Sequence, residues 1–157
     1  MPSEIIGTGA LWAALVAALV ITVIAKPEAG RLARGAPWAL VVLAIQSLHF
    51  AEEFSTGFHE RFPALLGLAQ WTPVFFVAFN MAWIAAWSLA IACAVTRRAT
   101  FLASWLVWFL AMAAVGNGIA HPVLAVVGGG YFPGLVTSPV LGAAGIFLIR
   151  ALMRRAV

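Results

Sequence analysis

Residues 72–96, TPVFFVAFNMAWIAAWSLAIACAVT, form an uncharged and largely apolar run that ends at Arg97 and Arg98. A helix needs about 20 mostly apolar residues to cross the hydrocarbon core of a membrane. The length and composition of this run therefore predict a transmembrane helix.

Four further apolar runs surround this one, over roughly residues 7–25, 36–55, 99–126 and 135–153. Pro37 suits the first turn of the run that begins near residue 36. Hydrophobic residues make up 64% of the chain and charged residues only 9%, whereas a soluble domain carries about 25% charged residues. We therefore expect an all-α fold, a polytopic transmembrane helix bundle of about five spans that forms a single domain over residues 1–157.

The basic residues predict the orientation of this bundle. The clusters contain Lys26, Arg31 and Arg34, then Arg97 and Arg98, and finally Arg150, Arg154 and Arg155. All of them fall on the same side of a five-span chain, and cytoplasmic loops carry an excess of lysine and arginine. We therefore expect a multi-pass protein of the cell (inner) membrane, with the N-terminus outside and the C-terminus in the cytoplasm. The net charge of +4 lies in these membrane flanks, so the lipid bilayer is the expected partner and nucleic acid is not.

Strongly polar side chains inside the expected spans indicate a site. They are Gln46, His49, Glu52 and Glu53 on the second span, Asn80 on the third, and Asn117 and His121 on the fourth. At about 1.5 Å of rise per residue, the side chains of His49, Glu53, Asn80, Asn117 and His121 lie roughly 22–34 Å from the basic ends of their spans. Ionisable groups inside a membrane are costly and commonly functional. The sequence therefore predicts an intramembrane site near the outer, extracytoplasmic face.

The spacing of these residues favours a metal site. His49, Glu52 and Glu53 share one helix face, because residues three and four positions apart are neighbours. Asn117 and His121 share a face of the fourth span for the same reason. Imidazole nitrogens and carboxylate oxygens suit zinc, iron or manganese. We therefore expect a divalent metal ion, zinc in preference to iron or manganese, bound by His49, Glu52, Glu53 and His121.

The segment 56–71 is too short to span a membrane and is expected to lie along its outer surface. Trp71 would anchor this segment at the interface. His59, between charged neighbours, would be a solvated loop residue. The single cysteine, Cys93, excludes a disulfide framework and a cysteine-based metal site.

Three motifs carry a family resemblance. His49-Phe50-Ala51-Glu52-Glu53 is an HxxEE pattern, followed by Asn117-x-x-x-His121 and by Tyr131-Phe132-Pro133-Gly134-Leu135-Val136-Thr137. In this order, over roughly residues 37–150, they resemble the small bacterial integral membrane family named for its HXXEE motif. That family has no established activity. The resemblance implies only that His49, Glu52, Glu53, Asn117, His121 and Tyr131 belong together.

Three functions remain open at this point. The first is a metal-dependent enzyme, hydrolase-like with zinc or oxidative with iron, that acts on an apolar or amphipathic (lipophilic) small molecule. Glu52 or Glu53 would be its general base, and Asn117 and Tyr131 would orient the substrate or stabilise an oxyanion. The second is a structural or binding subunit of a larger membrane complex or homo-oligomer, with a buried polar network. The third is a proton or metal-ion transporter, although the cytoplasmic halves of the third and fourth spans offer little polar lining.

Overall fold

The computed structural model describes residues 3–154, and within them it contains seven helices and no strand, which confirms the all-α prediction. The helices are α1 (Ser3–Gly7), α2 (Gly9–Ala25), α3 (Ala29–Ser55), α4 (Phe58–Leu65), α5 (Pro73–Val95), α6 (Thr100–Val127) and α7 (Ser138–Met153). Arg155, part of the expected C-terminal basic cluster, lies outside the described residues, as do the first two residues of the chain.

Four of the five apolar runs correspond to α2, α5, α6 and α7 with small differences at their ends. The predicted start of the second run is wrong. Instead of beginning near residue 36, α3 begins at Ala29, so Pro37 lies inside the helix. A proline removes one backbone hydrogen bond of the helix, but the first turn of α3 is braced by an ion pair between Arg31 and Glu28 at 2.9 Å.

Two of the described helices, α5 and α6, are long and apolar enough to cross a membrane. A buried helix of a soluble protein meets the same criterion, so this finding is weak evidence for a membrane location. α2 and α7 are apolar but have 17 and 16 residues, and α3 is longer but more polar. The five-span count and the orientation therefore remain predictions.

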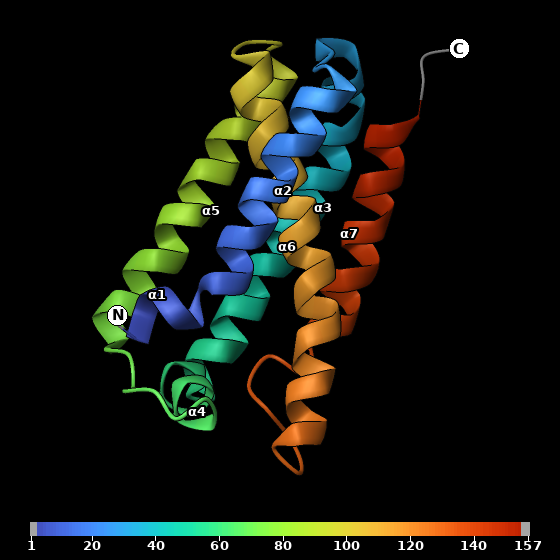
Figure 1. The fold of residues 1–157 in the computed structure, drawn as a ribbon. Helices are drawn as coiled ribbons and strands as arrows, with labels where there is room; N and C mark the ends of the chain where they lie inside the picture. The colour runs from blue at the N-terminus through green and yellow to red at the C-terminus, as the bar shows by residue number, and fades with distance from the viewer. Residues whose placement is uncertain (1–2, 155–157) are drawn as a thin grey trace.

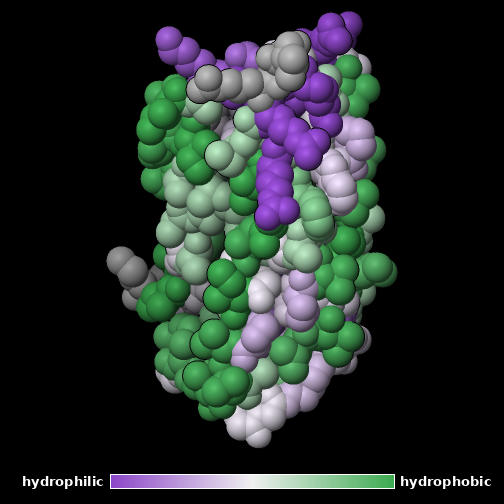
Figure 2. Space-filling model, turned by 90° about the vertical axis from the view of Figure 1, so that its right-hand side faces the viewer, coloured by the Kyte–Doolittle hydropathy of each residue, from purple (hydrophilic) through white to green (hydrophobic). Residues whose placement is uncertain are grey.

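The long helices run side by side along one axis (Figure 1). α6 contacts each of α2, α3, α5 and α7, so it is the central helix of the bundle. The last turns of α3 and α6, the first turns of α5 and α7, and all of α4 gather at the lower end in Figure 1. Strongly hydrophilic residues gather at the opposite, upper end of the face that Figure 2 shows.

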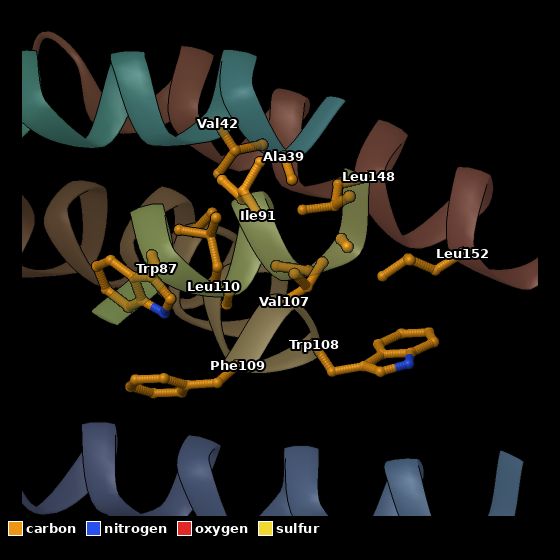
Figure 3. Packing of buried hydrophobic residues seen from close by; sticks show 14 of the residues in the cluster. Ala39, Val42, Trp87, Ile91, Val107, Trp108, Phe109, Leu110, Leu148 and Leu152 are labelled. Atoms are coloured by element: carbon orange, nitrogen blue, oxygen red, sulfur yellow. The ribbon is translucent and has the colours of Figure 1, made fainter. Parts of the chain in front are cut away.

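The apolar core surrounds α6 and is drawn in Figure 3. Phe109 and Leu110 of α6 are fully buried, and the ring of Phe109 meets that of Trp83 of α5 edge to face, with 4.8 Å between centroids. Leu148 of α7 and Val42 of α3 close the core from the other sides. This core fixes α3 against α6, the two helices that carry most of the polar side chains named above.

Gly118 of α6 and Gly142 of α7 let these two helices touch. A Cβ atom at Gly118 would lie 2.7 Å from the Cα atom of Gly142, and one at Gly142 would lie 2.9 Å from the Cα atom of Gly118. Small residues are the usual means of close approach between helices in membranes.

Replacing Gly118 with alanine should lower the free energy of unfolding by about 1–3 kcal/mol, because α6 and α7 must move apart to accept the methyl group. Thermal or denaturant unfolding of the purified chain measures this loss. Gly116→Ala is the matched control, because a Cβ atom there meets nothing within 4 Å and alanine is the better helix former. Equal destabilisation of both variants would contradict the assigned contact.

Candidate metal centre

Three buried side chains converge where α3 and α6 face each other. His49 and Glu53 lie one turn apart on α3, His121 lies on α6, and their exposed fractions are 0%, 6% and 2%. One carboxylate oxygen, Glu53 Oε1, lies 3.5 Å from His49 Nε2 and 3.3 Å from His121 Nε2. The two Nε2 atoms are 3.2 Å apart. These residues form a group that can hold a metal ion.

The separations match those between the ligands of a tetrahedral ion. Ligand atoms placed at about 2.0–2.1 Å from such an ion lie about 3.3 Å from one another. The three distances in the group, 3.2, 3.3 and 3.5 Å, scatter around that value. Little movement is therefore needed for the three atoms to bind one ion.

The main chain fixes the tautomer of His121. Its Nδ1 atom lies 2.6 Å from the carbonyl oxygen of Pro133. A carbonyl oxygen has no proton to give, so Nδ1–H is the donor. In the neutral ring the other nitrogen, Nε2, then carries a free lone pair, and this nitrogen faces Glu53 and His49.

A chain of hydrogen bonds fixes the tautomer of His49 in the same way. The Glu52 carboxylate accepts from the Tyr131 hydroxyl at 2.8 Å and from the Val136 N–H at 3.0 Å. It also accepts from the N–H and the hydroxyl of Thr137 at 2.9 and 2.6 Å. Because the Thr137 hydroxyl donates its single proton to Glu52, its oxygen accepts from His49 Nδ1, 2.7 Å away. The Nε2 atom of His49 therefore also presents a lone pair to the centre.

Two imidazole lone pairs and one carboxyl oxygen thus face one another, and neither neutral ring brings a proton to the contact. Such an arrangement is unfavourable in a buried site unless a positive charge lies between the three atoms. Histidines that bind metals commonly donate their second N–H to a carbonyl or a carboxylate. The partners of both rings here fit that pattern, with Thr137 connecting His49 to the carboxylate.

The structure places Glu52 outside the three-residue group. Its carboxylate is turned toward residues 131–137 and holds that loop through the hydrogen bonds given above. Tyr131 reaches the group only through Glu52 and is 44% exposed. Burial, followed by the hydrogen bond to Glu52, raises the pKa of the Tyr131 phenol, so the phenol keeps its proton and donates it. Arg61 donates to the carbonyl oxygen of Tyr131 at 3.0 Å and braces the loop from outside.

Gln46 and Asn117 lie one turn from His49 and His121 on α3 and α6, and Asn80 lies on α5. Asn117 donates to the side-chain oxygen of Gln46 at 3.5 Å, which links α6 to α3. Asn80 donates to the carbonyl oxygen of Phe76 in its own helix at 3.0 Å. All three amides line one cavity together with Glu53 and His121, whereas His49 and Glu52, which the sequence placed at the same level, do not line it.

The cavity has a volume of about 160 Å³. Beyond the polar wall it is lined by aromatic rings, from Phe58, Phe62, Trp71, Phe76, Phe79, Trp83 and Trp87. Because Glu53 and His121 contribute to the lining, a metal ion held by the three-residue group would lie beside this space.

Two expectations for the segment 56–71 are wrong. His59 is 7% exposed rather than solvated, and its ring stacks at 5.8 Å on that of Phe76. Trp71 is 5% exposed and meets the ring of Phe62 edge to face at 5.8 Å, so its indole is not presented as a surface anchor. Both residues join a cluster of aromatic side chains that closes the lower end of the bundle, and His59 is not part of the three-residue group.

Pro133, Gly134 and Thr137 touch the centre but were not among the candidate residues. Pro133 acts through its carbonyl oxygen, a group that residue types do not reveal. Gly134 has φ +86°, a conformation that favours glycine, and a Cβ atom at this position would point at both imidazole rings. The Pro-Gly pair is a turn signal, and it was the available hint that the chain folds back at this point.

A family model described as a protein of unknown function with HXXEE motif matches residues 38–148. No curated protein and no solved structure matches the chain.

Proposed function

The chain belongs to the HXXEE-motif family, whose function is unknown, and we propose that it is an integral membrane metalloprotein and a metal-dependent enzyme. One divalent ion would be held by His49, Glu53 and His121. The observation that supports this best is the meeting of two oriented Nε2 lone pairs with a carboxylate oxygen in a buried position. Glu52 would support the loop and the His49 tautomer instead of binding the ion.

The donor set favours zinc. Catalytic zinc sites commonly have three protein ligands and keep a further position for water or substrate, and two of the three residues that would hold the ion, Glu53 and His121, also line the cavity. Two histidines and one carboxylate also suit iron(II), which would turn the chemistry from hydrolysis to oxidation. A divalent ion here would lower the pKa of a bound water to about 7 and polarise a substrate carbonyl.

The residues around the cavity would then have separate roles in catalysis. Oε1 of Glu53 is the oxygen that faces the two imidazoles, so the other carboxylate oxygen, Oε2, would be the one to accept a proton during hydrolysis. The amides of Asn117 and Gln46 would orient a polar substrate group, and the aromatic wall would bind its apolar part. We assign Tyr131 to the support of the loop together with Glu52.

A membrane location with five spans, the N-terminus outside and the C-terminus in the cytoplasm, remains part of the proposal. Its support is the apolar character of α5 and α6 and the exposure of large apolar side chains, such as Val74 at 78% and Val126 at 82%. Soluble monomers rarely expose large contiguous apolar patches. The last turns of α3 and α6, close to the three-residue group, lie at the lower end of Figure 1. The helix ends next to the basic clusters lie at the upper end, so the centre would be near the extracytoplasmic face.

Metal analysis by mass spectrometry of the gently purified chain tests the proposal. We expect about one divalent ion per chain in the wild type and at least a tenfold loss in His121→Ala, because two protein ligands hold an ion poorly. His59→Ala is the control, since it removes another buried histidine outside the group and should leave the metal content unchanged. Circular dichroism of each variant verifies that the helices remain.

Wild-type protein that stays free of metal after growth and incubation with zinc, iron and manganese would refute the enzyme proposal. The His/Glu group would then be a proton-sharing network. Copurification of a fixed partner would in that case favour a structural or binding subunit, and ion flux in proteoliposomes would favour a transporter.

A further inference from the structure

We infer that the cavity beside the metal centre binds an uncharged group the size of a six-membered ring that carries a hydrogen-bond acceptor, and not an anionic head group. This inference rests on the proposed function, because it names the substrate class of the same site. It is carried by the volume, the lining and the charges of the cavity.

The volume sets the size of the ligand. An apolar cavity of about 150 Å³ inside a protein stays dry and binds benzene, and the cavity here measures about 160 Å³. One ring with a small substituent therefore fills it. A larger molecule would have to leave part of itself outside.

The residues that line the cavity determine the shape and the polarity of the ligand. Aromatic rings make up most of the wall, and the amides of Asn80 and Asn117 also line the cavity. Each of these amide groups has two N–H donors and donates one hydrogen bond, to Phe76 and to Gln46. An acceptor atom on a flat ligand would accept from a remaining N–H while its ring stacks on the aromatic walls.

The cavity wall away from the metal centre disfavours an anion. Glu53 and His121 are the ionisable residues among those that line the cavity, both belong to the proposed metal centre, and the lining contains no lysine or arginine. Transfer of an unpaired charge into such a space is strongly unfavourable. A phosphate or carboxylate group among the aromatic rings would find no countercharge in the wall around it.

The cavity has an opening that a longer molecule can use. Ala10 of α2 and Ala120 of α6 line it and are also exposed at the protein surface. The opening therefore lies beside these two helices. In the proposed membrane setting, an apolar tail attached to the bound ring would extend there into lipid.

Fluorine NMR titration of the full-length chain in lipid nanodiscs tests the inference. The probes are 4-fluorobenzyl alcohol and 4-fluorobenzoate, and the protein is first treated with EDTA so that the carboxylate cannot bind a metal ion. We expect saturable binding of about one alcohol per chain and at least about tenfold weaker binding of the benzoate, because the benzoate brings an unpaired charge.

Two variants locate the bound probe. Ala113→Leu places a larger side chain in the cavity wall, and Ala120→Phe narrows the opening. Both should abolish saturable binding of the alcohol. Ala51→Leu is the matched control on an exposed position of α3 away from the cavity, and it should bind like the wild type while correcting for probe dissolved in lipid.

Absence of saturable binding to the wild type, equal binding of the two probes, or unchanged binding by Ala120→Phe would overturn the inference. Because the titration uses metal-free protein, its result is separate from the metal analysis. A chain that binds the alcohol but no metal would refute the proposed enzyme and leave this binding site standing. A chain that binds metal but not the alcohol would refute this inference and leave the proposed enzyme standing.

Discussion

Replacing Gly134 with alanine should lower the affinity for a divalent metal ion by at least about 100-fold, because the new methyl group would occupy the place of both imidazole ligands. A Cβ atom at this position would lie 2.5 Å from Cε1 and Nδ1 of His121 and 2.7 Å from Cε1 of His49. No side chain can accept contacts this short without moving.

Neither ring has room to move and keep its hydrogen bonds. His121 is held by Pro133 and His49 by Thr137, and both rings are buried. The backbone adds a second cost, because a φ of +86° is unfavourable for alanine by about 1–2 kcal/mol. We therefore expect lower stability as well as loss of the metal.

Calorimetric titration with zinc and thermal unfolding measure the two effects. Gly129→Ala is a close control, because Gly129 lies in the same loop and also has a positive φ, +72°, yet a Cβ atom there meets nothing within 4 Å. This control should lose about 1 kcal/mol of stability for the same backbone reason and retain the metal. Wild-type affinity in Gly134→Ala would show that the rings do not pack on this residue.

The second large effect is expected for Glu52→Gln, which should weaken metal binding about 10–100-fold, the usual range for loss of an outer hydrogen-bonding partner. The amide replaces one acceptor oxygen with a donor that faces the donors on residues 131–137. Whichever oxygen is replaced, the new amide N–H opposes the backbone N–H of Val136 or Thr137. The loop that positions the Thr137 hydroxyl therefore shifts, and the His49 tautomer is less firmly enforced. Glu60→Gln, an exposed carboxylate on α4, is the control for the change in charge.

Substitutions of Thr137 test whether Glu52 supports the His49 tautomer through Thr137 or binds the metal ion itself. Thr137→Val removes the hydroxyl and should weaken metal binding as much as Glu52→Gln does. Thr137→Ser keeps the hydroxyl and should retain most of the wild-type affinity for the metal. If Glu52 were itself a ligand, Glu52→Gln would eliminate the metal and Thr137→Val would have little effect. Zinc titrations of the three variants distinguish the two roles.

Helical periodicity made the main part of the site predictable. His49 and Glu53 are four residues apart and necessarily share a helix face, and His121 was predicted to lie in the same outer part of the bundle. The uncharged run of residues 72–96 predicted α5 almost to its ends because nothing in it interrupts a helix. These features depend only on local geometry and on distance along a helix.

The parts that sequence reasoning missed depend on contacts between distant segments. Glu52 and Glu53 are chemically identical neighbours, but they are separated by about 100° of helix rotation. Glu53 therefore faces His121 of α6, whereas Glu52 faces the loop of residues 131–137 that follows α6. Which carboxylate would face the ion could be decided only once that loop was in place. His59 was placed in solvent because its neighbours are charged, whereas the rings of Phe54 and Phe76 enclose it.

The outer hydrogen bonds of both imidazoles end on one short segment, residues 133–137. Metal occupancy and the ordering of this segment are therefore thermodynamically linked, since an ion that binds only the ordered form stabilises that form by mass action. Anything that pulls the segment away removes the support of both ligands in one step. Retention and release of the ion would then follow a single cooperative equilibrium, and amide hydrogen exchange across these residues would report the occupancy of the centre.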